Sequence, residues 1–348
     1  MTSPRLHASA GRRRVRRLKN ALILAAAAAV VLLALVLARS GSGSGGGGEH
    51  RLPTADRLGR PPGPGGPGGL AWPREGEAAV AVAGLGGLGS SGGEEPVPIA
   101  SLAKVMTAYL VLKDHPLEPG EEGFTITIGP ADVEDLHRRM DLGQSVVAVE
   151  AGEVLSERQA LEALLLPSAN NVAILLAVHE AGSVEAFVAE MNEAAAELGM
   201  GRTHYTDPSG FEDTTVSTAT DQLKLARAAI ADPTFAAIVA MPSVSLPVVG
   251  EVANYNALVG HEGFVGIKTG SDDAAGGCLL FARRVHIDGR TVTMLGAVLG
   301  QREGDFIPAA LSAARELAAA AARRAWRGGT AQLLRPRALA ELRALWRP

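Results

Sequence analysis

Hydrophobic residues near the N-terminus form one long run without a polar interruption. The segment ALILAAAAAVVLLALVLA, residues 21–38, has 18 residues without a charge. As a helix it would be about 27 Å long, just enough to cross a bilayer. Six cations precede it between Arg12 and Lys19, whereas Arg39 alone follows it before a neutral stretch. This asymmetry predicts a basic cytoplasmic tail over residues 1–20 and places everything after the segment outside the cytoplasm.

Two interpretations of residues 21–38 stay open. The segment is either a transmembrane anchor or a signal segment, because Val36 and Ala38 are small enough for a signal-peptidase site. We therefore expect a single-pass protein of the cell membrane, or a secreted protein if the segment is cleaved. Residues 39–76 contain GSGSGGGG and RPPGPGGPGG, a composition that cannot bury a core and predicts a flexible linker.

From about residue 77 the chain changes to short apolar runs with strand or helix periodicity. The run AAVAVAG after Glu77 is short and precedes a glycine-rich turn, which predicts a buried strand. Apolar residues at helical spacing predict a helix from Ser101 to about Lys113. Cap signals mark further helices in the middle of the chain: Ser156 with Gln159, Gly199, and Thr218 with Asp221.

Strand character returns in the last third of the chain. GFVGIKTG (263–270) predicts a strand, and the runs GGCLLFARRVHI and RTVTMLGAVLG are joined by an Asp-Gly pair, a strong hairpin signal. An alanine-rich helix is expected over 307–325, and residues 327–348 predict an amphipathic tail helix. Since strands at both ends enclose helices, we predict an α+β fold over 77–326, with one antiparallel sheet built from both chain ends and a helical middle subdomain.

Composition and charge narrow the function classes. With 47% hydrophobic and 20% charged residues, the 348-residue chain can bury a sizeable core. The net charge of -4 does not indicate nucleic-acid binding, because the only dense basic run lies beside the apolar segment. The single Cys278 cannot form an intramolecular disulfide, and its apolar neighbours predict an ordinary buried thiol.

One lysine is unusual because the chain otherwise prefers arginine. There are 28 Arg and only five Lys, yet Lys104 follows Ser101 by three residues inside an apolar run. On a helix these two side chains share a face and are close enough to hydrogen-bond. A buried lysine can lose its proton and serve as the base for a serine nucleophile, which arginine practically never does. The alternative is a lysine whose amine simply reaches the surface.

A turn between two predicted helices carries further polar side chains. PSANN places Ser168 and Asn170 where they can point into a cleft. The alternative is that Ser168 or Asn171 only caps the following helix.

A third segment, IKTGSDDAAGG, lies at the end of a predicted strand. It places Lys268 and Thr269 there, followed by Gly270, whose missing side chain cannot obstruct a ligand. Two of the five lysines therefore belong to candidate site segments.

These three segments, SLAK, SAN and KTG, resemble the motifs S-x-x-K, S-x-N and K-T-G of the serine penicillin-binding enzymes, in the same order. The resemblance extends through PIASLAKVMTAYLVL, LLLPSANNVAILLA, THYTDPSGFEDTTVSTATDQLKLA and GFVGIKTGSDDAAGGCLL. It covers roughly residues 77–325 and is greatest to the low-molecular-weight D-alanyl-D-alanine carboxypeptidases. It implies a β-lactamase/DD-peptidase-like fold.

The resemblance also implies a reaction on peptidoglycan stem peptides that end in D-Ala-D-Ala. Ser101 would attack the carbonyl between the two D-alanines, Lys104 would take its proton, and Ser168 would relay a proton to the leaving amine. The implied substrate-binding residues are Asn170, Lys268, Thr269, Gly270, Ser271 and Arg302. Water would release the acyl group, β-lactams would acylate Ser101 as inhibitors, and no metal or organic cofactor is called for. The catalytic domain would be extracytoplasmic.

The implied binding roles differ among these residues. Asn170 would bond the substrate's amide backbone, and Lys268 with Thr269 would hold the terminal carboxylate. The backbone N–H groups of Ser101 and Ser271 would hold the oxyanion. Arg302, in LGQREGD, lies about where the family has an arginine for the carboxylate; the alternative is a solvated loop charge.

Other functions are compatible with part of the pattern. A class A-like β-lactamase would share the three motifs, but no E-x-x-L-N segment lies between SAN and KTG to supply its glutamate. A non-catalytic wall-binding protein of the same fold would need no base beside a serine. A zinc peptidase is disfavoured because the sequence contains no H-E-x-x-H. A Ser-His-Asp hydrolase is disfavoured because His179, His204 and His261 fit helix-end or loop positions better than a catalytic triad. Whether the enzyme trims, cross-links or cleaves cross-bridges stays open.

Overall fold

A computed structural model describes residues 69–118, 120–287 and 289–332, with side chains described as far as residue 326. The predicted cytoplasmic tail and apolar segment, residues 1–38, lie outside this part, as do most of the predicted linker and residues 333–348.

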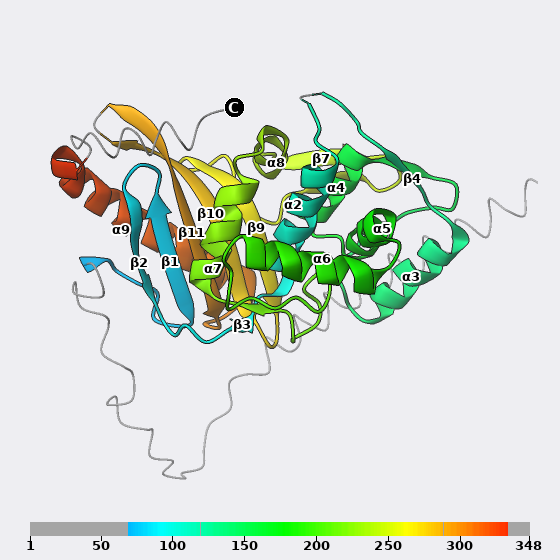
Figure 1. Ribbon diagram of the computed structural model, residues 1–348, viewed down its shortest axis with the longest axis horizontal. Helices are drawn as coiled ribbons and strands as arrows, with labels where there is room; N and C mark the ends of the chain where they lie inside the picture. Colours follow the sequence, from blue (N-terminus) through cyan, green and yellow to red (C-terminus); the bar gives the residue numbers. More distant parts are fainter. Residues whose placement is uncertain (1–68, 119, 288, 333–348) are drawn as a thin grey trace, which may run out of the picture. The chain divides into compact units, whose positions relative to one another are not determined.

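Five antiparallel strands form the main sheet, in the order β2-β1-β11-β10-β9 (Figure 1). Their bounds are β1 Glu77–Val82, β2 Gly86–Ser91, β9 Phe264–Asp272, β10 Gly276–Ile287 and β11 Arg290–Gln301. β1 pairs with β11, with Glu77 opposite Leu299, so the first strand is hydrogen-bonded to the last. β10 and β11 pair from Ile287 opposite Arg290, which confirms the predicted hairpin. The sheet is built from both ends of the folded domain, as predicted.

The chain between β2 and β9 forms the predicted helical middle. Its elements are β3 Val97–Pro98, the 3₁₀ helix η3 Ala100–Ala103, α2 Lys104–Asp114, β4 Thr125–Thr127, α3 Pro130–Asp141, β5 Val154–Ser156, α4 Glu157–Leu165, α5 Asn170–Ala181, α6 Val184–Glu197, β6 Val216–Ser217, α7 Ala219–Ala229, α8 Pro233–Val239, β7 Ser243–Leu246 and β8 Gly250–Ala253; α9 Phe306–Gln332 follows the sheet. β3 pairs with β6, β4 with β5 and β7 with β8. Within the described ranges no single helix has the length and apolar character of a membrane span, whereas α5 and α6, bent by 85° at their junction, meet that criterion as a pair.

The predicted helix caps are confirmed. The Ser156 hydroxyl accepts from the backbone N–H of Gln159, and the Gln159 side chain accepts from the Ser156 N–H, which completes a capping box. Thr218 caps α7 by accepting from the N–H of Asp221. Gly199 follows the end of α6 with a φ of 70°, the left-handed conformation expected just after a helix.

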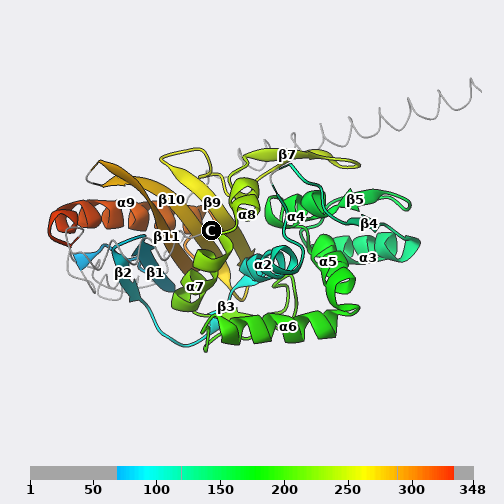
Figure 2. The ribbon, with the colours of Figure 1, turned by 45° about the horizontal axis from the view of Figure 1, so that its top comes forward.

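Two apolar clusters lie on opposite faces of the sheet. α9 packs on one face, and α7 packs on the other (Figures 1 and 2). Along β10, Leu279 and Phe281 belong to the α9 cluster, whereas Leu280 and Ala282 belong to the other cluster. Side chains alternate across a strand, so burial of both faces makes this strand a continuous apolar run in the sequence.

Both predicted boundaries of the folded domain need correction. Leu70 and Trp72 are only 1% and 6% exposed and pack in the α9 cluster, so the domain includes residues assigned to the 39–76 linker. The glycine and proline content of that segment concealed these two large apolar side chains. At the other end α9 continues to Gln332, past the boundary drawn after residue 326.

Candidate active site

Ser101 lies in η3, where three segments of the chain meet. A Cβ on Gly270 of β9 would lie 2.9 Å from the backbone nitrogen of Ser101 and 3.0 Å from the Ile99 oxygen. On another side, Gly210 has a φ of 75°, and a side chain there would overlap the carbonyl oxygen of Ala100. The missing side chain of Gly270 therefore makes room for the turn that carries Ser101, a second use of this glycine beside the predicted one, which stays a prediction.

The turn around Ser101 is tighter than predicted. Ala100–Ala103 form a 3₁₀ turn, and the α-helix begins only at Lys104. Ala100 has a φ of 45°, a conformation that few residues with a side chain adopt. Ser101 nevertheless lies at the N-terminal end of this helical segment, as predicted.

Lys104 is fully buried, and its amine contacts two oxygens. Nζ lies 2.8 Å from Ser101 Oγ and donates to the Ser209 carbonyl oxygen at 2.7 Å. Burial lowers the pKa of this amine well below its usual value, and the positive charge of Lys268 lowers it further. The neutral amine can donate one N–H to Ser209 and direct its lone pair at the Ser101 hydroxyl, which is the arrangement a general base needs. The alternative of a lysine that reaches the surface is wrong.

The carbonyl that holds Lys104 belongs to a loop that the sequence analysis did not assign to the site. Asp207 organises this loop by accepting hydrogen bonds from the N–H groups of Ser209, Phe211 and Glu212 and from the hydroxyls of Ser209 and Thr215. Thr107 on α2 fastens it further by donating to the Pro208 oxygen at 2.7 Å. The segment TDPSG carries a turn signal, but its contact with a lysine 105 residues earlier comes from the tertiary structure.

Ser168 and Asn170 are buried at the start of α5, which packs against α2. Among the described residues, neither the Ser168 hydroxyl, on a residue with a φ of 66°, nor Asn170 Oδ1 has a hydrogen-bond partner. Neither residue caps α5, because Ala169 precedes the helix without a side-chain cap. Asn171 bonds both backbone groups of Val147 instead. The capping alternative is wrong, and two buried polar atoms stay available for a ligand.

The amide of Asn170 is oriented by a chain of hydrogen bonds from α3. Asn170 Nδ2 donates to Gln144 Oε1 at 2.9 Å, and the same oxygen accepts from the Arg139 guanidinium at 3.0 Å. Arg139 Nε in turn lies 2.5 Å from Asp135 Oδ2. Because Gln144 offers its oxygen, Asn170 must present its nitrogen there, which leaves its own oxygen for another partner. Nothing in the sequence pattern singled out Gln144 or Arg139.

Lys268 lies beside the Ser101 turn, on β9. Its side chain is 1% exposed, Nζ donates to the Thr269 oxygen at 3.0 Å, and burial lowers its pKa to about 7. Thr269 is also buried, whereas Ser271, two residues further along the strand, is exposed. The structure thus brings Ser101, Lys104 and Lys268 together from two distant segments.

Arg302 lies against the turn after β9, and Cys278 lies on β10 opposite Gly270. The exposed Arg302 donates to the carbonyl oxygens of Asp273 and Ala274, which holds it against the turn between β9 and β10. The described residues show no hydrogen bond from Arg302 to the K-T-G segment. Cys278 is fully buried, which raises the pKa of its thiol to about 12 and confirms the predicted inert thiol.

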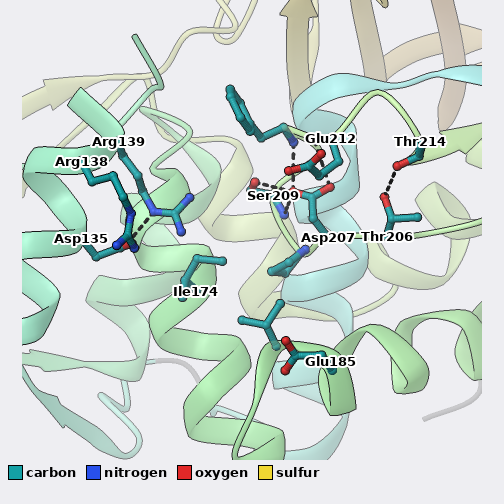
Figure 3. Close-up of a pocket in the computed structure, with 13 residues that line it drawn as sticks. Asp135, Arg138, Arg139, Ile174, Glu185, Thr206, Asp207, Ser209, Glu212 and Thr214 are labelled. Atoms are coloured by element: carbon teal, nitrogen blue, oxygen red, sulfur yellow. Dashed lines mark hydrogen bonds and ion pairs between the residues drawn. The ribbon is translucent and has the colours of Figure 1, made fainter. Parts of the chain in front are cut away.

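A cavity of about 580 Å³ lies next to these motifs (Figure 3). It is lined by α3, the start of α6, Ile174 on α5 and the loop over residues 206–214. Ser209 belongs to this lining as well as to the contact with Lys104, whereas the three motifs themselves do not line the cavity. It therefore adjoins the catalytic candidates without containing them.

The sequence profile of the D-alanyl-D-alanine carboxypeptidase family matches residues 88–298, more than half of the chain. The chain belongs to this family. D-alanyl-D-alanine carboxypeptidase DacB2 of Mycobacterium tuberculosis is 38% identical over 185 residues, which cover 51% of this chain and 59% of that protein. The D-alanyl-D-alanine endopeptidase of Escherichia coli is 31% identical over 210 residues, which cover 57% and 62%. The chain thus spans about six tenths of the length of these two family members.

Solved structures resemble the folded domain. The crystal structure of the Streptomyces K15 DD-transpeptidase matches with a TM-score of 0.62 and 26% identity, over 72% of this chain and 98% of that one. Penicillin binding protein 6B from Escherichia coli shares the fold with a TM-score of 0.61 at 24% identity, over 70% and 76%. These matches confirm the predicted α+β, β-lactamase/DD-peptidase-like fold class.

Proposed function

We propose that the protein is a serine D-alanyl-D-alanine carboxypeptidase that removes the terminal D-alanine from peptidoglycan stem peptides. One observation carries the proposal: a fully buried lysine amine lies 2.8 Å from Ser101 Oγ, in a chain of this family. In this reaction Lys104 takes the hydroxyl proton while Ser101 attacks the carbonyl between the two D-alanines. The products of this step are an acyl-enzyme and free D-alanine.

The oxyanion that forms during attack needs fixed N–H donors. The proposal assigns them to the backbone nitrogens of Ser101 and Ser271. The close approach of β9 to the Ser101 turn at Gly270 supports this assignment, because Ser271 follows Gly270 directly. Ser168 relays the proton to the leaving amine, and its hydroxyl has no other partner in the described structure.

The terminal carboxylate of the substrate is assigned to Lys268 and Thr269. With its pKa lowered to about 7, Lys268 is only partly charged near neutral pH, and an arriving carboxylate favours the charged form. The unpaired Oδ1 of Asn170 is assigned to an N–H of the substrate backbone. Arg302 is proposed as an indirect aid that fixes the turn after β9.

Slow release of a β-lactam, rather than rapid turnover, is expected from the same site. A class A-like β-lactamase activates water with a carboxylate near the serine. Of the three acids on the loop that contacts Lys104, Asp207 is the one whose charge acts on that amine, and five hydrogen-bond donors already use its oxygens. β-Lactams are therefore proposed as acylating inhibitors of this protein.

The location proposed for the reaction follows from the N-terminal sequence. The charge-free segment 21–38 after a basic tail is the basis for a single-pass anchor in the cell membrane, with the catalytic domain outside the cytoplasm. If a peptidase cleaves this segment, the domain is secreted instead.

The deciding experiment is D-alanine release by the full-length protein from an acyl peptide ending in D-Ala-D-Ala, with Ser101→Ala as the control. Release that is absent in Ser101→Ala supports the proposal and assigns the nucleophile. Adding an amine acceptor separates hydrolysis from transfer, because a transpeptidase would convert the acyl group to a new peptide. A folded protein that releases no D-alanine and is not labelled by a fluorescent penicillin would sink the proposal in favour of a wall-binding role.

A further inference from the structure

The cavity beside the catalytic motifs has two walls of opposite charge (Figure 3). Arg138 and Arg139 on α3 form the first wall. Glu212 of the 206–214 loop and Glu185 in the first turn of α6 belong to the second. Ile174 lies between them and adds an apolar surface.

The α3 wall retains positive charge. Asp135 is the ion-pair partner of both Arg138 and Arg139, so one carboxylate faces two guanidinium groups. Arg139 also donates a hydrogen bond to Gln144. The Arg138 side chain is 69% exposed, and Asp135 is its only ion-pair partner among the described residues, so its remaining N–H donors can bind a carboxylate from solution.

The opposite wall retains negative charge. Glu185 and Glu212 are exposed, and neither forms an ion pair with a cation in the part of the chain that the structure describes. The third acid of this wall, Asp207, is compensated by hydrogen bonds from its own loop. The two glutamates are thus the groups that can attract an ammonium ion.

Three contacts connect the cavity with the catalytic residues. Ser209 lines the cavity, and its carbonyl oxygen accepts a hydrogen bond from Lys104, whose amine also contacts Ser101 Oγ. Arg139 lines the cavity and orients Asn170 through Gln144. Ile174 lies one helical turn beyond Asn170 on α5. A side chain of a substrate whose backbone lies on Asn170 is therefore close to this cavity.

We propose that the cavity binds the side chain of the substrate residue just before the two D-alanines, and that this side chain ends in both a carboxylate and an ammonium group. The proposal rests on the carboxypeptidase function proposed above. The carboxylate binds Arg138, the ammonium binds Glu185 and Glu212, and the methylene groups contact Ile174. A residue such as lysine, which ends in an ammonium alone, leaves the arginine wall without a partner.

The geometry of a peptide agrees with this assignment. Consecutive residues of an extended chain advance by about 3.5 Å, so the residue before the D-alanines lies one such step from the attacked unit. The volume of about 580 Å³ exceeds what such a side chain alone occupies, which also leaves room for bound water.

The experiment compares three acyl tripeptides that end in D-Ala-D-Ala and differ only in the first amino acid. This amino acid is meso-diaminopimelate, its form with an amidated side-chain carboxylate, or L-lysine. With the full-length protein, kcat/KM for D-alanine release is expected to be about fivefold to tenfold higher for the diaminopimelate peptide than for either of the others. This is the size of effect expected when a partly exposed ion pair with Arg138 is added to the ion pair of the ammonium group.

Two variants with matched exposure test which side chain causes the preference. Arg138→Gln is expected to bring the ratio of diaminopimelate to lysine kcat/KM close to one. Arg315→Gln is the control, because Arg315 on α9 is 61% exposed and also pairs with one carboxylate, that of Glu262. This variant is expected to keep the wild-type ratio. Labelling by a fluorescent penicillin shows that Ser101 is still reactive in both variants.

The outcomes distinguish this inference from the proposed function. Equal kcat/KM for the three peptides, or a preference that survives Arg138→Gln, would overturn the inference while leaving carboxypeptidase activity in place. Equal kcat/KM for the amidated peptide and the diaminopimelate peptide would overturn the role of the side-chain carboxylate. If no peptide loses D-alanine and penicillin does not label Ser101, the proposed function fails, and the inference fails with it.

Discussion

Among single residues, burial gives two lysines their proposed roles. Lys104 and Lys268 are 0% and 1% exposed, in a chain whose other cations are mostly arginine. Removing an amine from water favours its neutral form, and the two positive charges also disfavour each other. An arginine would stay charged at either position, which explains the use of lysine.

The base role of Lys104 predicts the effect of Lys104→Met. Methionine keeps the length and the apolar stem but removes the amine. Acylation of Ser101 by a fluorescent penicillin is expected to slow by about 10²-fold to 10⁴-fold, the range that general-base catalysis contributes. The melting temperature serves as the control and should change little, because loss of the hydrogen bond to Ser209 is offset by removal of a buried amine. Acylation within a few-fold of the wild-type rate would contradict the base role.

The two lysines also predict a bell-shaped pH profile of kcat/KM for D-alanine release. Lys104 must be neutral to accept a proton, so activity falls on the acid side as this amine becomes charged. Lys268 must be charged to bind a carboxylate, so activity falls above about pH 7, where its amine loses the proton. Lys268→Arg stays charged and is expected to remove the alkaline limb. An unchanged alkaline limb in Lys268→Arg would assign that limb to another group.

At the scale of elements, the loop over residues 206–215 positions the catalytic helix. Its Ser209 and Pro208 carbonyls hold Lys104 and Thr107, two residues on α2. The shape of the loop depends on Asp207, which no motif singled out. This loop therefore affects the site by positioning α2. We do not expect it to contact the peptide bond that is cleaved.

Asp207→Asn tests this positioning role. The amide nitrogen cannot accept the bonds now received by Asp207 Oδ2 from Ser209 and Phe211, so the free energy of unfolding is expected to fall by about 1–3 kcal/mol. The negative charge of Asp207 also raises the pKa of Lys104. Its loss should move the acid limb of kcat/KM to lower pH, which a purely structural role would not do. Urea unfolding and the pH profile measure the two effects separately.

At the scale of the whole molecule, the first residues of the domain complete its second apolar cluster. Leu70 and Trp72 pack with α9 although they precede the first strand of the sheet. A fragment that begins at residue 77 is therefore expected to be less stable than one that begins at residue 69. The loss should be about 3–5 kcal/mol, the cost typical of removing large buried side chains. Trp72→Ala in the longer fragment should reproduce most of the loss in a urea titration, and equal midpoints would contradict it.

The stability of the molecule should also depend on Glu157. This residue is 1% exposed at the start of α4, and burial raises its pKa from an ordinary 4.5 to about 7. The folded state therefore holds the proton more tightly than the unfolded state. This contribution is complete below about pH 4.5 and is lost as the pH rises to about 7, by about 3 kcal/mol. Glu157→Gln should flatten this fall in urea titrations between pH 4.5 and 8, and a fall as steep as in the wild type would assign it elsewhere.

The local pattern of the chain was enough for its elements and for the three motifs. Caps at Ser156 and Thr218 and the hairpin between β10 and β11 were predictable, because each depends on neighbours a few positions away. The same local pattern was enough to name Ser101, Ser168 and Lys268 as candidate site residues. The family membership followed from the order of these motifs and is confirmed.

Contacts between distant segments decided the rest. The reason for Gly270 lies in the approach of β9 to the Ser101 turn, and the partner of Lys104 lies on a loop 105 residues later. The bonds from Arg139 through Gln144 to Asn170, and the charged cavity beside them, likewise join separate elements. The sequence by itself determined which side chains are candidates for the chemistry, since this depends on residue type and local spacing. Only the tertiary structure decided which of them are buried, paired and oriented, because these properties arise where segments far apart in the chain pack together.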